Sequence, residues 1–318
     1  MAEDSAGVPN VNALAARADD FRHCKLCFSQ RSRPTYSLSR GAVVFACPDC
    51  GFHYINYLDD LEKLGGTPTP DQKERHFHYV DTVLQASQER FASKVALLKQ
   101  HGTLLGARCL DVGAGGGLFL HLLREEGAEV RGIEPDPLNW SYAQERFQFN
   151  FDRLPVEDPC WRMHAEGFFD IVTLWDVIEH VNFPATTLSS ASRLIKPGGL
   201  LCLDTPARDA FLYRTGEVLY RLSGGRLRSL LGAQYSNQAF GHKQIFSSSQ
   251  MRRTLETNGF DVVKLVKVHE LSFPYEVYLR RILGSASAAR LARPLASLVF
   301  WLFRVRNKMI VVAKRRSR

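Results

Sequence analysis

The chain has 318 residues, of which 45% are hydrophobic and 23% charged, a composition typical of a globular protein with one α/β core and room for a small second domain. Its formal net charge of +8 is unevenly spread: 11 of the 41 basic residues and no acids lie in 277–318, which leaves 30 basic against 33 acidic residues, a net of −3, in 1–276. No run of 18 apolar residues predicts a transmembrane helix, and no basic and apolar leader predicts secretion, so we expect a cytoplasmic protein.

Residues 1–20 are predicted to form a flexible leader, and a small cysteine-bearing domain follows over 21–57. Two Cys-x-x-Cys pairs lie there, separated by 19 residues: Cys24, Cys27, Cys47 and Cys50. In a cytosolic chain this spacing favours a metal over disulfides, because two tight turns joined by a hairpin can present four thiolates tetrahedrally. We predict a structural zinc ribbon. The alternative, two unmetallated pairs, would leave a domain with little core.

Residues 58–74 contain Gly-Gly-Thr-Pro-Thr-Pro and are predicted to link the ribbon to a larger domain over 75–318. After a helical pattern over 75–101, apolar strand patterns alternate with helical ones. The predicted strands are 108–112, 129–133, 147–151, 169–174, 199–204, 262–268 and 309–313. The predicted helices are 117–126, 138–145, 186–194 and 248–258. This alternation predicts an α/β, Rossmann-like, mostly parallel sheet with helices on both faces.

A glycine-rich turn joins the first of these strands to its helix. The stretch 110–120 reads Leu-Asp-Val-Gly-Ala-Gly-Gly-Gly-Leu-Phe-Leu, and the next strand ends at Glu134. Glycines allow a sharp turn and close approach of a ligand, and an acid about 20 residues on can accept hydrogen bonds from ribose hydroxyls. Leu118 departs from the dinucleotide pattern G-x-G-x-x-G/A. Asp111 would repel a pyrophosphate but suits the cationic amino acid portion of S-adenosylmethionine, so we favour that cofactor over a nicotinamide dinucleotide.

The chain from about 79 to 314 resembles the class I S-adenosylmethionine-dependent methyltransferases. Residues 169–181, Phe-Asp-Ile-Val-Thr-Leu-Trp-Asp-Val-Ile-Glu-His-Val, match that family's fourth strand and the turn after it, and 192–199 match its helix-to-fifth-strand turn. The resemblance implies a seven-stranded sheet. It also implies these cofactor-binding residues: Asp111, Gly113, Ala114, Gly115 and Gly117 for the methionine and ribose end, Glu134 for the ribose hydroxyls, and Asp176 and Tyr79 for the amino acid portion. Packing on an amphipathic helix explains Tyr79 equally well. The adenine-binding residue falls within 152–157 and is not assigned.

A hydroxyl acceptor needs a base to take its proton, and His180 is our candidate because an ordinary histidine pKa suits the task. Glu179 would orient it, and His242 is a weaker candidate base. The alternative for His180 is a capping or packing role in the loop. Residues 206–245 are rich in aromatic side chains and are predicted to form a lid over the acceptor.

These features predict a methyltransferase that acts, at oxygen, on a small molecule, a sugar or a lipid-linked glycan. Similar bacterial enzymes pair a ribbon with this fold in glycan or secondary-metabolite biosynthesis, and the Asp-Val-Ile-Glu-His turn is also similar to that of quinone-biosynthesis methyltransferases. The basic segment 277–318 suggests contact with an anionic membrane or with phosphate groups. An RNA base methyltransferase and a non-catalytic scaffold are the alternatives. The sequence specifies neither the acceptor nor the oligomeric state.

Overall fold

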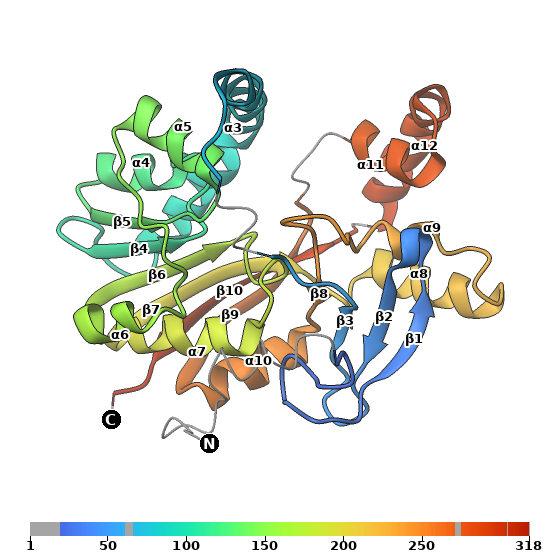
Figure 1. Ribbon diagram of the computed structural model, residues 1–318, viewed down its shortest axis with the longest axis horizontal. Helices are drawn as coiled ribbons and strands as arrows, with labels where there is room; N and C mark the ends of the chain where they lie inside the picture. The colour runs from blue at the N-terminus through green and yellow to red at the C-terminus, as the bar shows by residue number, and fades with distance from the viewer. Residues whose placement is uncertain (1–19, 61–65, 271–274, 304, 318) are drawn as a thin grey trace.

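The computed structural model describes residues 20–60, 66–270, 275–303 and 305–317. Its centre is a six-stranded sheet with the strand order β5–β4–β6–β7–β10–β9 (Figure 1). Neighbours from β5 to β7 are parallel, and β10 runs antiparallel between β7 and β9. The bounds are β4 (Arg108–Val112), β5 (Glu129–Ile133), β6 (Phe169–Trp175), β7 (Ile195–Pro206), β9 (Phe260–Val268) and β10 (Lys308–Arg315). The predicted α/β fold with a mostly parallel sheet is confirmed.

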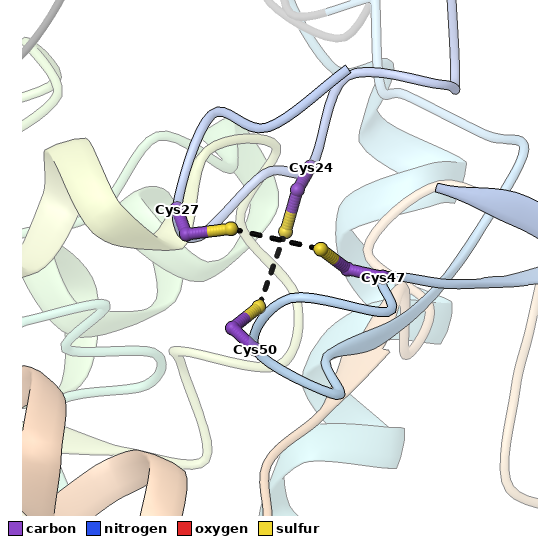
Figure 2. A group of neighbouring side chains, drawn as sticks. All are labelled: Cys24, Cys27, Cys47 and Cys50. Carbon is purple, nitrogen blue, oxygen red and sulfur yellow. Dashed lines mark hydrogen bonds between the residues drawn. The ribbon is translucent and has the colours of Figure 1, made fainter. Parts of the chain in front are cut away.

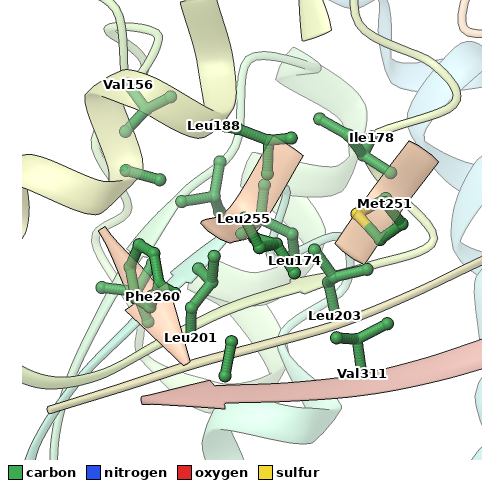
Figure 3. Close-up of a cluster of buried hydrophobic side chains, with 14 of the residues drawn as sticks. Val156, Leu174, Ile178, Leu188, Leu201, Leu203, Met251, Leu255, Phe260 and Val311 are labelled. Atoms are coloured by element: carbon green, nitrogen blue, oxygen red, sulfur yellow. The ribbon is translucent and has the colours of Figure 1, made fainter. Parts of the chain in front are cut away.

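Helices cover both faces of this sheet (Figure 1). One face carries α3 (Pro70–Lys99), α4 (Leu118–Glu125) and α5 (Pro137–Phe147), and the other carries α6 (Pro159–Ala165), α7 (Pro184–Leu194) and α10 (Ser248–Thr257). Successive side chains of a strand point to opposite faces of the sheet, so alternate residues pack against the two helix layers. On β6, Leu174 joins the cluster under α7 and α10 (Figure 3). Val172 belongs to the same cluster, whereas Ile171 and Trp175 join the one under α3 and α4.

The prediction of a strand over 147–151 is wrong. Helix α5 extends to Phe147, and the following segment meets the sheet only through a bridge between Ile133 and Asp152. The alternating phenylalanines of this segment are packing groups: the rings of Phe149 and Phe151 stack 5.2 Å apart, and a Cβ on Gly132 of β5 would lie 2.6 Å from Phe151 Cδ1. The described sheet therefore has six strands instead of seven.

The cysteine-bearing segment folds as an antiparallel sheet of β1 (Arg33–Ser37), β2 (Val43–Ala46) and β3 (His53–Ile55). A fourth strand, β8 (Gln244–Ile245), comes from far along the chain and pairs with β3. The rings of Phe52 and Phe246 lie 4.7 Å apart, and Cys24 and Cys47 belong to the same buried cluster as the core of the large sheet. The ribbon is thus packed into the rest of the molecule. The division of the chain at 57 and 74 stays a prediction, and helix α3 begins inside the predicted linker, at Pro70.

Within 206–245, α8 (Phe211–Leu222) and the short α9 (Ser229–Gly232) pack against the ribbon sheet. Tyr213 donates or accepts a hydrogen bond with His53 Nδ1 at 3.0 Å, and the rings of Tyr220 and Tyr36 lie 5.0 Å apart. Near the C-terminus, α11 (Tyr275–Leu283) contacts α9 and leads into α12 (Ala286–Phe303). Among the described residues, no helix is long and apolar enough to cross a bilayer. The predicted leader 1–20 lies outside the described residues except for its last position.

Candidate functional site

The loop after β4 has a backbone that requires glycine. Gly113, Gly115 and Gly117 have φ angles of 75°, 54° and 86°, in the left-handed region that side chains disfavour. A Cβ on Gly113 would also lie 2.6 Å from Val177 Cγ2. Helix α4 begins directly after this loop, so the predicted strand–turn–helix is confirmed.

Glu134 is held beside this loop by hydrogen bonds. The N–H of Ala114 donates to the carbonyl of Ile133 at 2.9 Å, which fixes the loop against the end of β5. The buried Glu134 carboxylate accepts from the N–H groups of Gly115 at 2.6 Å and Asp136 at 2.8 Å. Burial raises the pKa of Glu134 to about 7. Each carboxylate oxygen retains a lone pair, so the group can still accept hydrogen bonds from hydroxyls of a ligand.

Asp111 lies beneath the loop, near the end of β4. Its Oδ1 accepts a hydrogen bond of 2.6 Å from Thr173 Oγ1 on the neighbouring strand β6. Burial raises the pKa of Asp111 to about 7, although the Thr173 hydrogen bond and the charge of Lys94 act in the opposite direction. A cation bound above this carboxylate would favour its ionised form.

The ends of β6 and β7 carry a cluster of alternating charges. Its members are the acids Asp176, Asp204 and Glu270 and the bases Arg90, Lys94 and Lys308. Arg90 binds Asp176 at 2.7 Å and Lys94 binds the fully buried Asp204 at 2.5 Å. The cationic neighbours Lys308 and Arg90 hold the pKa of Asp176 well below its usual range, against the effect of burial. Three acids are therefore balanced by three bases. Helix α3 supplies two of these bases and β10 supplies the third.

The pairing of Asp176 with Arg90 and Lys308 bears on its predicted contact with the amino acid portion of the cofactor. Its carboxylate is already engaged, so a ligand would have to share these partners. Tyr79, the other residue predicted there, is half exposed on α3, with its ring 6.1 Å from that of His76. Its neighbour Val80 reaches the loop: a Cβ on Gly116 would lie 2.9 Å from Val80 Cγ1. Helix α3 thus covers the loop through Val80.

The turn after β6 brings together the three predicted catalytic residues. His180 Nε2 lies 3.9 Å from Glu179 Oε1, and the rings of His180 and His242 lie 4.7 Å apart. Glu179 is fully buried, and neither of its carboxylate oxygens has a hydrogen-bond partner among the described residues; the same holds for His180 Nδ1. Such unpartnered buried groups are rare and mark a place where a ligand or a solvent molecule can bind. One ligand atom from each of the three residues lies within 4.8 Å of the others, a geometry that can also hold a metal ion.

The ionisation of these three residues differs. Burial and the charge of Asp176 raise the pKa of Glu179 to about 8, whereas burial lowers the pKa of His180 and, with the charge of His180, brings that of His242 to about 3. At neutral pH both imidazoles are therefore uncharged and able to accept a proton.

The four ribbon cysteines converge on one point (Figure 2). Sγ of Cys24 lies 3.6 Å from that of Cys50, the Cys27–Cys47 distance is also 3.6 Å, and all four Sγ atoms lie within 4.8 Å of one another. Four sulfurs around a tetrahedral zinc at about 2.3 Å would lie about 3.8 Å apart. The donor set and its spacing therefore fit zinc.

Sequence reasoning missed the partners that surround the predicted acids. These are Arg90, Lys94, Thr173, Asp204, Glu270 and Lys308. One local signal existed: Arg90 and Lys94 are four residues apart and share one face of a helix. Nothing local indicated that Lys308 would reach Asp204 from 104 residues away.

Known methyltransferases are similar to this chain. The family model described as "Methyltransferase domain" matches residues 74–265. The ubiquinone biosynthesis O-methyltransferase of Nitrosococcus oceani is 30% identical over 148 residues, 45% of this chain and 56% of that protein. The enzyme of the same name from Colwellia psychrerythraea is 32% identical over 191 residues, 58% of this chain and 74% of that protein. A third enzyme of the same name, from Sodalis glossinidius, is also similar. The match covers only about half of the length of the Nitrosococcus oceani and Sodalis glossinidius proteins, 56% and 47%.

Among solved structures, magnesium protoporphyrin IX methyltransferase from Synechocystis PCC 6803 is similar with a TM-score of 0.47 and 17% identity, over 81% of this chain and 98% of that one. The family match covers more than half of the chain and contains the glycine loop, Asp111 and Glu134. The chain therefore belongs to the methyltransferase-domain family of S-adenosylmethionine-dependent enzymes.

Proposed function

We propose that this protein transfers a methyl group from S-adenosylmethionine to an oxygen of a small, quinone-type acceptor. The observation that carries the proposal is the buried Glu179 beside His180, on the turn that directly follows β6; its carboxylate has no hydrogen-bond partner within the described part of the chain. The glycine loop lies at the end of the adjacent strand β4, so the two features share the carboxyl edge of the sheet, where open α/β folds bind their ligands. The names of the relatives support oxygen as the methylated atom and a quinone-type ring as the acceptor.

The residues around the loop suit the cofactor. Glu134 would accept hydrogen bonds from the ribose hydroxyls, and Gly113, Ala114, Gly115 and Gly117 would let the cofactor approach the backbone. Asp111 would face the cationic amino acid portion, with Asp176 and Tyr79 further along it. When bound there, S-adenosylmethionine would supply an electrophilic methyl group for the acceptor oxygen, with S-adenosylhomocysteine as the leaving group.

His180 is the residue that we propose to take the hydroxyl proton. Because burial lowers its pKa, the imidazole is neutral at pH 7 and can accept a proton at Nδ1, which has no hydrogen-bond partner among the described side chains. Glu179 would orient the imidazole and bind the acceptor hydroxyl. The segment 206–245, whose helices α8 and α9 pack against the ribbon sheet, would cover the acceptor as a lid. No observation favours sugar, lipid-linked glycan or RNA acceptors, or a scaffold role.

Turnover on a soluble probe tests this function. We expect the purified protein to transfer radiolabelled methyl from S-adenosylmethionine to a ring oxygen of 3,4-dihydroxybenzoate. In His180→Ala, kcat should fall by roughly 100-fold or more with an unchanged KM for the cofactor, as expected for loss of a general base. His242→Asn is the matched control and should lose less. Transfer to RNA or to methyl glucoside alone, or no transfer at all, would contradict the proposal.

We also propose that the four cysteines bind one structural zinc ion. All four donors are protein thiolates, which closes the coordination sphere and leaves no position for a substrate. Metal analysis of the purified full chain should find about one zinc per molecule. Cys27→Ser should lose it, while Cys160→Ser, which alters a cysteine outside the cluster, should retain it. Equal zinc content in both variants would rule the site out.

We also propose that the C-terminal helix α12 binds an anionic membrane surface. Leu291, Leu295 and Leu298 follow one another at helical spacing and are 84%, 66% and 50% exposed. Arg290 and Arg293 are exposed beside them, and 277–318 contains no acid. An apolar row flanked by arginines is typical of helices that lie in the headgroup region of a bilayer.

Vesicle sedimentation tests this contact. The protein should sediment with vesicles that contain phosphatidylglycerol and much less with phosphatidylcholine alone. A Leu291→Ser/Leu295→Ser variant should lose most of the binding, whereas Leu105→Ser, which changes a leucine that is 75% exposed elsewhere, should not. Equal binding to both vesicle types, or to all variants, would contradict this proposal.

A further inference from the structure

Two adjacent residues hold the backbone of the turn 178–181. Gln244 Nε2 donates to the first carbonyl of the turn at 2.8 Å and to the fourth at 2.7 Å. The backbone N–H of Lys243 donates to the second carbonyl at 2.8 Å, and Lys243 Nζ donates to the third at 2.6 Å. Four successive carbonyl groups thus accept hydrogen bonds from one dipeptide.

These donors are buried. Lys243 and Gln244 are both 0% exposed, so their polar atoms have exchanged water for the carbonyls of the turn. A buried polar group that loses its partner costs about 1–3 kcal/mol, and more if it is charged. The turn therefore cannot shift away from the dipeptide without leaving several groups unsatisfied.

The same dipeptide belongs to the ribbon sheet. Gln244 lies in β8 and pairs with Tyr54 of β3, and the N–H of Ile55 donates to the carbonyl of Lys243 at 2.8 Å. Directly after the ribbon, Asp59 binds Lys243 Nζ at 2.7 Å through its carboxylate. Asp59 also exchanges two hydrogen bonds with the side chain of Asn182, at 2.8 and 2.9 Å. The ribbon therefore reaches the turn by two connections.

We infer that Lys243 and Gln244 are positioning residues for Glu179 and His180. The cysteine ribbon in turn holds Lys243 and Gln244 in place. His242 directly precedes Lys243, so the same connection sets the 4.7 Å spacing between the two imidazoles. Calling His180 the group positioned for catalysis rests on the function proposed above. The mechanical link from ribbon to turn does not.

Small displacements matter at such a site. A reacting group that moves by about 1 Å can lose about 100-fold in rate, and catalytic side chains must be held within about 0.5 Å of their working geometry. A ribbon remote from the glycine loop would then influence the rate of methyl transfer without changing the affinity for the cofactor.

The test compares two buried glutamines that both attach the ribbon. Gln244→Leu removes two donor bonds to the turn. Gln250→Leu is the matched control, since Gln250 Nε2 donates at 2.7 Å to the carbonyl of Cys50 and so attaches the ribbon to α10 instead of to the turn. In the full chain, we expect Gln244→Leu to raise the hydrogen-exchange rates of the amides of 178–182 by tenfold or more. Its Kd for S-adenosylhomocysteine should stay within twofold, and with the 3,4-dihydroxybenzoate probe kcat should fall about 10- to 100-fold at an unchanged cofactor KM. Gln250→Leu should leave exchange in the turn unchanged.

Asn182→Ala is the second variant, should Gln244→Leu not fold. It removes only the reciprocal pair with Asp59 and should raise exchange in the turn in the same direction. Unchanged exchange in a folded Gln244→Leu or Asn182→Ala, or equal loosening in Gln250→Leu, would overturn the inference. A wild-type protein without turnover would contradict the proposed function alone, because exchange and cofactor affinity are measured without an acceptor.

Discussion

The burial of carboxylates at the carboxyl edge of the parallel sheet is the constraint on which the rest of this molecule depends. Four neighbouring strands end in or beside an acid: Glu134 after β5, Asp111 in β4 and Asp204 in β7 are buried, and Asp176 after β6 is partly buried. Burying a charge is costly unless it is paired or hydrogen-bonded. Each acid therefore dictates what must lie beside it, and those requirements fix the positions of α3, β10 and the glycine loop.

The negative charges of the four acids are compensated in two different ways, which distinguishes two parts of the site. Asp176 and Asp204 are paired with protein cations, which fastens α3 and β10 to the strand ends. Among the residues that the structure describes, Asp111 and Glu134 receive only hydroxyl and backbone N–H donors, and burial raises the pKa of each to about 7. That pair is left in need of a positive charge or of further donors, which is what a cationic cofactor with ribose hydroxyls provides. Beyond it, the turn with Glu179 and His180 is held by the ribbon.

The sequence was sufficient for the parts of this site that are local. The strand–turn–helix around Gly113 and the acid after the next strand follow from spacing and from the conformational demands of glycine. The phenylalanines of 147–151 misled, because alternation in a strand and alternation in packed rings look alike in a sequence. The contacts of Lys94 and Lys308 with Asp204 and the pairing of β8 with β3 join residues more than 100 positions apart, and no local pattern encodes such pairings. For the same reason the sequence does not indicate that the ribbon packs against the core of the large sheet.

Calorimetric titration with S-adenosylhomocysteine at pH 6.5, in two buffers of different ionisation enthalpy, tests the central claim most directly. With pKa values raised to about 7, Asp111 and Glu134 are partly protonated in the free protein at this pH, and the ligand's ammonium and hydroxyl donors favour the ionised forms. Binding should therefore release protons, affinity should rise from pH 6 to pH 8, and Asp111→Asn and Glu134→Gln should each bind more weakly and release fewer protons. Binding without proton release, or undiminished in both variants, would contradict the claim that these two carboxylates form the cofactor site.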